Sequence, residues 1–174
     1  MSVECTGEAI FEMAEQIERQ GGKFYRAAAE QTTNEDARGL LLRLADAEER
    51  HEDFFAYLRS EAPKEAAQPS ESGMQEDGPL YMHAVAASHL LGADKDVSEI
   101  LTGKESVEDI FNIAIEFEKD TIVFFLGIRE NGPECGHSRE IADLLREEMT
   151  HVADLRRQID QLAWAEKAKT GFSE

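Results

Sequence analysis

The sequence repeats itself without a gap at an offset of 100 residues, and this repeat constrains the fold more than any other feature. Apolar residues that recur every three or four positions form one face of an α-helix. Each half contains two such stretches, so we predict an all-α chain, a four-helix bundle built from two repeated helical hairpins. The matched pairs are mainly inward-facing residues: Ile10 and Ile110, Phe11 and Phe111, Ala14 and Ala114, Glu18 and Glu118, Phe24 and Phe124, Leu44 and Leu144, Glu48 and Glu148, and His51 and His151.

Capping and turn residues set the predicted boundaries. Asn34 is suited to cap the second helix, and Ser106 with Asp109 has the spacing of a capping box at the start of the third. These signals place the hairpins at about 7–60 and about 106–167, within a single domain that spans residues 1–174.

The connection between the hairpins, residues 61–105, is long. It opens with a stretch rich in Pro, Ser, Ala and Glu, which predicts an exposed linker. A short helix is then predicted over 80–91, ended by Gly92, followed by a single turn over 98–101. A crossover of this length allows the second and third bundle helices to lie parallel.

Acids and histidines interrupt the apolar faces at matched positions. Residues three apart share a helix face, so each Glu-x-x-His can aim a carboxylate and an imidazole at one point. An acid on an inward face is costly unless it is paired, protonated or bound to metal. We therefore predict one dinuclear metal site; the alternatives are a buried Glu–His ion pair and a surface acid beside a capped core histidine. The candidate ligands are Glu18, Glu48, His51, Glu118, Glu148 and His151.

Other polar residues near these stripes are weighed against ordinary structural roles. Tyr25 lies two turns after Glu18 and either bonds a metal ligand or is a core aromatic with a hydrated hydroxyl. Arg50 and Asp154 are candidates to support the ligands from outside. Glu12 and Glu15 are predicted to be solvated. Three further histidines are interpreted as ordinary polar residues: His83, His89 and His137.

Composition narrows the classes of function. The formal net charge of -19 argues against nucleic acid as a partner, because phosphate binding needs basic patches. No apolar run is long enough to cross a membrane, and the N-terminus lacks the pattern of a signal peptide, so we expect a cytoplasmic protein. Cys5 and Cys135 are expected to be free thiols.

The sequence around the candidate ligands resembles the rubrerythrin-like branch of the ferritin-like superfamily. The resemblance implies a ferritin-like fold, a homodimer and a non-haem centre of two iron ions, for which Mn or Zn could substitute. It implies that Glu48 and Glu148 bridge the irons, that Glu18 and Glu118 are terminal ligands, and that His51 and His151 bind one iron each. The stretches that carry the resemblance are Ile17–Tyr25, Ala47–Glu52, Glu116–Phe125 and Glu147–His151.

Two departures from rubrerythrins bear on the reaction. The chain has no rubredoxin-like Cys pairs, so an external electron donor, such as a rubredoxin-like protein, is expected. Rubrerythrins also carry a further Glu three residues after the ligand that corresponds to Glu118, where this chain has Thr121. We expect an oxidoreductase that reduces O₂ or peroxide in oxidative stress or iron handling. The alternatives are an iron-binding or ferroxidase protein without reductase turnover and a metal-free helical interaction module.

Overall fold

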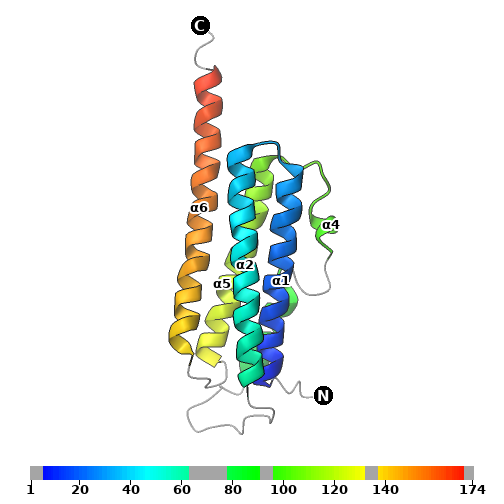
Figure 1. Ribbon diagram of the computed structural model, residues 1–174, viewed down its shortest axis with the longest axis vertical. Helices are drawn as coiled ribbons and strands as arrows, with labels where there is room; N and C mark the ends of the chain where they lie inside the picture. Colours follow the sequence, from blue (N-terminus) through cyan, green and yellow to red (C-terminus); the bar gives the residue numbers. More distant parts are fainter. Residues whose placement is uncertain (1–5, 63–77, 91–95, 132–136, 171–174) are drawn as a thin grey trace.

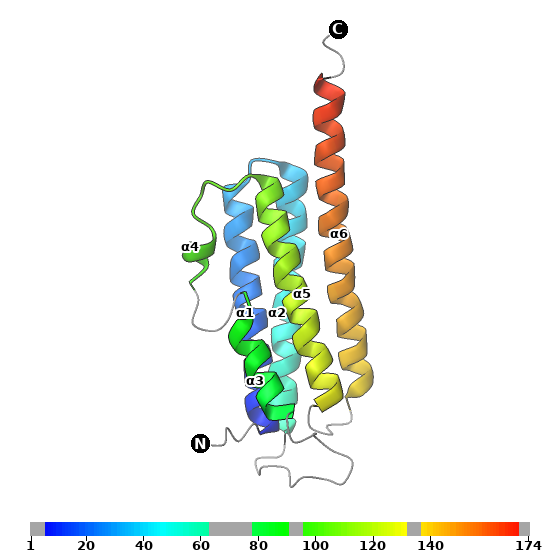
Figure 2. The ribbon, with the colours of Figure 1, turned by 180° about the vertical axis from the view of Figure 1, so that it is seen from behind.

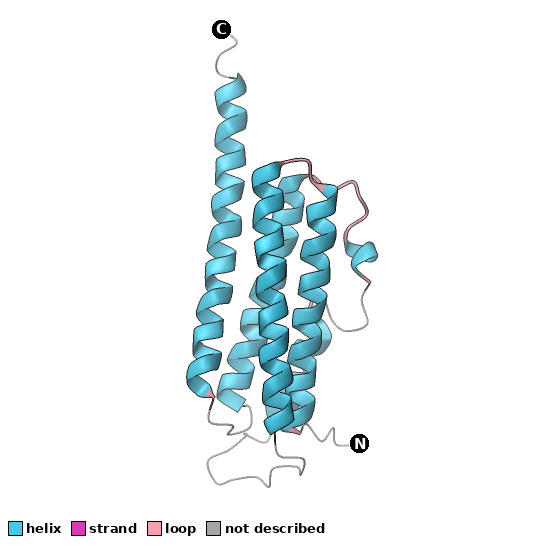
Figure 3. Cartoon of the chain, in the orientation of Figure 1, coloured by secondary structure: helices cyan, strands magenta, loops and turns pink. Residues whose placement is uncertain are grey.

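The computed structural model describes residues 6–62, 78–90, 96–131 and 137–170. Four long helices form a bundle in these residues, and no strand occurs among them, which confirms the all-α prediction (Figure 1, Figure 3). No helix in these ranges is long and apolar enough to span a membrane. The helices are α1 (Gly7–Gln31), α2 (Glu35–Glu61), α3 (Gly78–Ser88), α4 (Val97–Ile100), α5 (Val107–Asn131) and α6 (Ser138–Thr170).

The bundle consists of two antiparallel hairpins, α1 with α2 and α5 with α6. Helices α2 and α5 run in the same direction, as expected from the long crossover (Figure 1, Figure 2). The core lies between the four long helices and is lined by the predicted apolar stripes. It includes Ile10, Phe11, Ala14, Phe24, Leu44, Phe55, Ile110, Phe111, Ala114, Phe124, Phe125, Leu145 and Leu155.

The predicted caps fix where the long helices begin. The Asn34 side chain accepts a hydrogen bond from the Ala37 N–H at 3.0 Å. Ser106 and Asp109 form the predicted capping box: the Asp109 N–H donates to Ser106 Oγ at 3.1 Å, and the Ser106 N–H donates to Asp109 Oδ2 at 2.9 Å. Each contact satisfies a backbone N–H that has no partner within the helix.

The crossover departs from its prediction at the end of α3. The helix ends at Ser88, so the predicted end at 91 was wrong; Gly92 lies outside the described residues. The Leu90 N–H donates instead to Asp120 Oδ2 of α5 at 2.9 Å, and His89 Nε2 lies 3.1 Å from Thr121 Oγ1. These contacts with α5 take the place of the backbone hydrogen bonds that a further turn of α3 would make. His89 is only 1% exposed, so this polar residue belongs to the packed interior.

Two adjacent glycines in α1 offer a test of how closely the hairpins pack. A Cβ on Gly21 would lie 2.5 Å from Phe117 Cζ of α5, whereas the nearest atom to a Cβ on Gly22 would be Glu48 Cβ at 3.7 Å. We expect Gly21→Ala to lower the free energy of unfolding by about 1–3 kcal/mol, because the core is overpacked. Gly22→Ala should instead raise it by about 0.5–1 kcal/mol through its helix propensity. Urea denaturation of both variants checks this; equal effects would contradict the close packing.

Candidate metal centre

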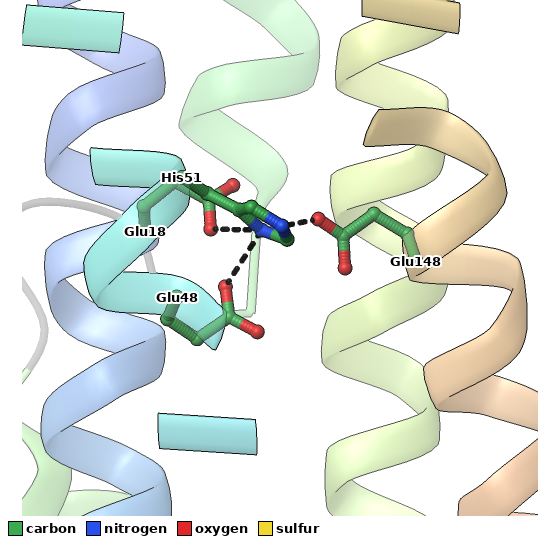
Figure 4. Close-up of side chains that lie close together, drawn as sticks. All are labelled: Glu18, Glu48, His51 and Glu148. Carbon is green, nitrogen blue, oxygen red and sulfur yellow. Dashed lines mark ion pairs between the residues drawn. The ribbon is translucent and has the colours of Figure 1, made fainter. Parts of the chain in front are cut away.

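The structure brings all six candidate ligands together in the middle of the bundle. They form two overlapping groups, Glu18, Glu48, His51 and Glu148, and Glu48, Glu118, Glu148 and His151. Within each group, one candidate ligand atom per residue lies within 4.8 Å of the others. Figure 4 shows the first group, with carboxylates from three helices pointing at the His51 ring. Since Glu48 and Glu148 belong to both groups, the two groups form one centre.

The two histidines occupy equivalent positions about this centre. His51 Nδ1 lies 2.9 Å from Glu148 Oε1 and 3.5 Å from Glu18 Oε2. His151 Nδ1 lies 2.8 Å from Glu148 Oε2 and 3.5 Å from Glu118 Oε1. The two 3.5 Å distances are equivalent under the repeat. Both histidines lie closer to Glu148 than to Glu48, whose nearest oxygens are 3.9 Å from His51 Nδ1 and 3.8 Å from His151 Nδ1.

The carboxylates are buried without enough hydrogen-bond donors. All four glutamates of the centre are 0% exposed. Within the described part of the chain, neither oxygen of Glu18 or Glu48 has a hydrogen-bond partner. A buried Glu–His ion pair accounts for the contacts of Glu148 but leaves these four oxygens unsatisfied, which is costly for buried charges. Carboxylate and imidazole ligands of this number fit two metal ions, which would neutralise and coordinate the orphaned oxygens.

Burial and mutual repulsion change the acidity of the centre. Burial raises the pKa of Glu18 and of Glu48 well above the usual value, and repulsion from Glu148 and Glu118 adds to this. Burial also favours a raised pKa for Glu148, but its contacts with His151 and His51 outweigh burial and lower it to about 2. The metal-free centre therefore retains protons that a metal ion must displace, so metal affinity should increase with pH.

Tyr25 contacts the centre directly. Its ring is fully buried, and its hydroxyl donates a hydrogen bond to Glu118 Oε1. The interpretation as a core aromatic with a hydrated hydroxyl was therefore wrong. The repeat partner, Phe125, has no hydroxyl, so this bond orients the carboxylate of only one hairpin.

We expect Tyr25→Phe to weaken metal binding by about tenfold, because Glu118 loses the donor that orients it. The substitution keeps the ring, so packing against Phe24 and Phe117 should persist. Titration of the metal-free protein with Co²⁺ measures the change. Phe24→Leu serves as a control for altered packing beside the same ring, and an equal loss in both variants would contradict an orienting role.

Several residues outside the predicted ligand set take part in the surroundings. Glu15 was predicted to be solvated, but it is only 6% exposed, because Arg19 of the next turn (2.7 Å) and Arg59 of α2 (3.0 Å) pair with it. Asp154 pairs with Arg157 on its own helix. Cys5 and Cys135 lie outside the described residues.

Glu147 contacts the centre, and the sequence did not predict this contact. Its Oε2 lies 3.0 Å from Nε2 of His51, across the interface between the hairpins. Arg50, a predicted supporting residue, has Nη1 3.7 Å from the same oxygen and so pairs with the carboxylate that contacts the histidine. The clue in the sequence was the position of Glu147, directly before the second Glu-x-x-His.

Comparisons with known proteins agree with this geometry. Residues 9–77 match the family model described as Rubrerythrin. This part of the chain is similar to rubrerythrins. The fold of the chain resembles that of a candidate ferritin-like diiron-carboxylate protein from Thermotoga maritima, whose crystal structure was determined at 2.30 Å; the TM-score is 0.67 and the identity 19%, over 89% of this chain and 95% of the other. No curated protein sequence gives a significant match.

These findings confirm the rubrerythrin-like resemblance and the ferritin-like fold. The family match contains Glu18, Glu48 and His51 of the first hairpin. The second hairpin lies outside the match and is tied to the first by the repeat, which places Glu148 and His151 in equivalent positions.

Proposed function

We propose that the centre binds two iron ions and that the protein is an oxidoreductase that reduces O₂ or peroxide in oxidative stress or iron handling. The observation that carries the proposal is the sharing of Glu48 and Glu148 between two four-residue ligand groups. In this assignment Glu48 and Glu148 would serve both ions, and Glu18 and Glu118 would serve one ion each. His51 and His151 would each hold one ion.

When bound, two Fe(II) ions would supply two electrons, which with two protons suffice to reduce one hydrogen peroxide to two waters. Tyr25 holds the Glu118 carboxylate in place and closes that side of the centre with its buried ring. On the other side, a groove of about 250 Å³ between α2 and α6 is lined by His51, Phe54 and Leu144 and offers a small oxidant a route to the histidine.

Sustained turnover needs an electron donor from outside the chain. The sequence holds two cysteines, fewer than the four thiolates of a rubredoxin-like site. We therefore infer that a separate rubredoxin-like protein supplies the electrons. A cytoplasmic homodimer remains our expectation for the working form.

Anaerobic reconstitution tests this function. We expect the metal-free protein to take up two Fe(II) ions per chain and then to consume peroxide over many turnovers with a reducing donor system. Glu148→Ala, which removes a shared ligand, is the control. Peroxide consumption no faster than that of Glu148→Ala would contradict the oxidoreductase assignment.

One observation favours iron binding or ferroxidase activity without reductase turnover. Thr121, which stands where rubrerythrins carry a further Glu, is buried and lies 3.1 Å from His89 Nε2. A hydroxyl in this contact cannot serve as an additional carboxylate ligand. This alternative predicts that Fe(II) oxidation stops near two ions per chain even with reductant present. Failure to bind iron at all would instead leave a metal-free helical module.

A further inference from the structure

The outer ring nitrogen of His51, Nε2, has a carboxylate partner. His51 Nε2 lies 3.0 Å from Glu147 Oε2, a carboxylate on the opposite hairpin. At the offset of 100 residues, the position that corresponds to Glu147 is Ala47, which is only 3% exposed. The repeat therefore gives His151 no counterpart of this carboxylate.

Arg50, which pairs with Glu147, also has no equivalent in the second hairpin. Arg50 Nη1 lies 3.7 Å from Glu147 Oε2, so the carboxylate lies between the guanidinium and the imidazole. The residue that corresponds to Arg50 is Thr150, whose hydroxyl donates to the Arg146 carbonyl on its own helix at 2.9 Å. The chain of contacts Arg50–Glu147–His51 thus crosses from α2 to α6 and back, and nothing in the repeat reproduces it.

The chemistry of imidazole connects this contact to metal binding. A metal ion on Nδ1 needs the lone pair of that nitrogen, so the remaining ring proton lies on Nε2. There it is donated to Glu147. A carboxylate that accepts this proton fixes the ring orientation and makes the imidazole a stronger ligand.

We propose that Glu147 selectively strengthens the metal position at His51, so that this position binds a divalent metal ion more tightly than it would without the carboxylate. This inference rests on the metal centre of the proposed function. Glu147 is a positioning residue, since it acts through His51. Its side chain is 50% exposed, and solvent weakens its charge, so the expected contribution is about tenfold in affinity, the lower end of the range for such partners.

Anaerobic titration of the metal-free protein with Co²⁺ tests this selective effect. We expect two binding steps in the wild type. In Glu147→Gln, which keeps the size but removes the charge, one step should weaken by about tenfold while the other stays unchanged. Glu140→Gln is the matched control, because Glu140 lines the same groove and its nearest ion-pair partner is His137. It should leave both steps as in the wild type.

Histidine variants assign the step to its position. The effect of Glu147→Gln should persist in a His151→Ala background and vanish in a His51→Ala background, as a double-mutant cycle requires. In Co²⁺-loaded protein, the paramagnetically shifted N–H signal of His51 should move in Glu147→Gln, and that of His151 should not. A change of fold alone would move both signals.

The possible outcomes separate the two claims. Two bound ions with equal effects of Glu147→Gln and Glu140→Gln would overturn the role of Glu147 and leave the metal centre intact. The same holds if the effect of Glu147→Gln survives in His51→Ala. A wild-type protein that binds no Co²⁺ would overturn the proposed metal centre itself, and the inference with it.

Discussion

Saturating Fe(II), supplied without oxygen, is expected to raise the melting temperature of the metal-free protein by roughly 10 °C. A ligand that binds only the folded state at a thousand times its Kd adds about 4 kcal/mol to the free energy of unfolding. For a domain of this size, each kcal/mol corresponds to about 2–4 °C. The rise has a local cause: the ions neutralise the buried carboxylates of Glu18, Glu48, Glu118 and Glu148.

The Glu148→Ala variant should lose most of this rise. Glu148 contacts both His51 and His151, at 2.9 and 2.8 Å, and belongs to both ligand groups, so its removal affects both ions. We expect a loss of affinity beyond the 10–100-fold typical of an outer-sphere partner. Glu140→Gln, an acid of α6 outside the ligand groups, should keep the full rise. Calorimetry with and without Fe(II) measures the rise in melting temperature. A rise in Glu148→Ala as large as in the wild type would contradict the shared-ligand assignment.

Glu18→Met should stabilise the metal-free protein while impairing metal binding. Both Glu18 oxygens are buried without a hydrogen-bond partner, and methionine has a similar volume and no charge. Replacement of buried ionic groups by apolar residues of similar size is often stabilising by about 1–4 kcal/mol. Urea denaturation of chelator-treated protein measures this gain. The control is Glu12→Met on the same helix, where the exposed side chain should give a change within about 0.5 kcal/mol.

The advantage of Glu18→Met should grow with pH. Burial raises the pKa of Glu18 in the folded protein, so the folded state holds this proton more tightly than the unfolded state does. The wild type is therefore favoured below the unfolded-state pKa and loses stability as pH rises toward the folded-state value. The variant lacks this loss. A gain in the free energy of unfolding that stayed constant from acidic to neutral pH would show that burial does not raise the pKa of Glu18.

Much of the fold could be predicted because its determinants are local. Helical periodicity locates the four long helices, and short-range hydrogen bonds at Asn34 and Ser106 fix two of their starts. The repeat then predicts a part of the tertiary structure. If both hairpins place Glu and Glu-x-x-His at the same height, two facing hairpins bring them together, as the structure shows for Glu48 and Glu148.

The features that escaped prediction depend on contacts between elements that the repeat does not relate. Glu15 is buried because Arg59 reaches it from α2. His89 is buried because the end of α3 exchanges helical hydrogen bonds for bonds to α5. Glu147 resembles a solvated acid until the packing of the two hairpins places His51 opposite it. Periodicity within one helix carries no signal for any of these contacts.

Anomalous scattering from crystals of the protein reconstituted with Fe(II) without oxygen tests the central claim most directly. The account predicts two iron peaks per chain, about 3.5–4 Å apart as in other two-metal sites, both between Glu48 and Glu148. One peak should lie beside Nδ1 of His51 and the other beside Nδ1 of His151. If crystals of the fully loaded protein show a single iron peak, or no peak among these side chains, the account is contradicted.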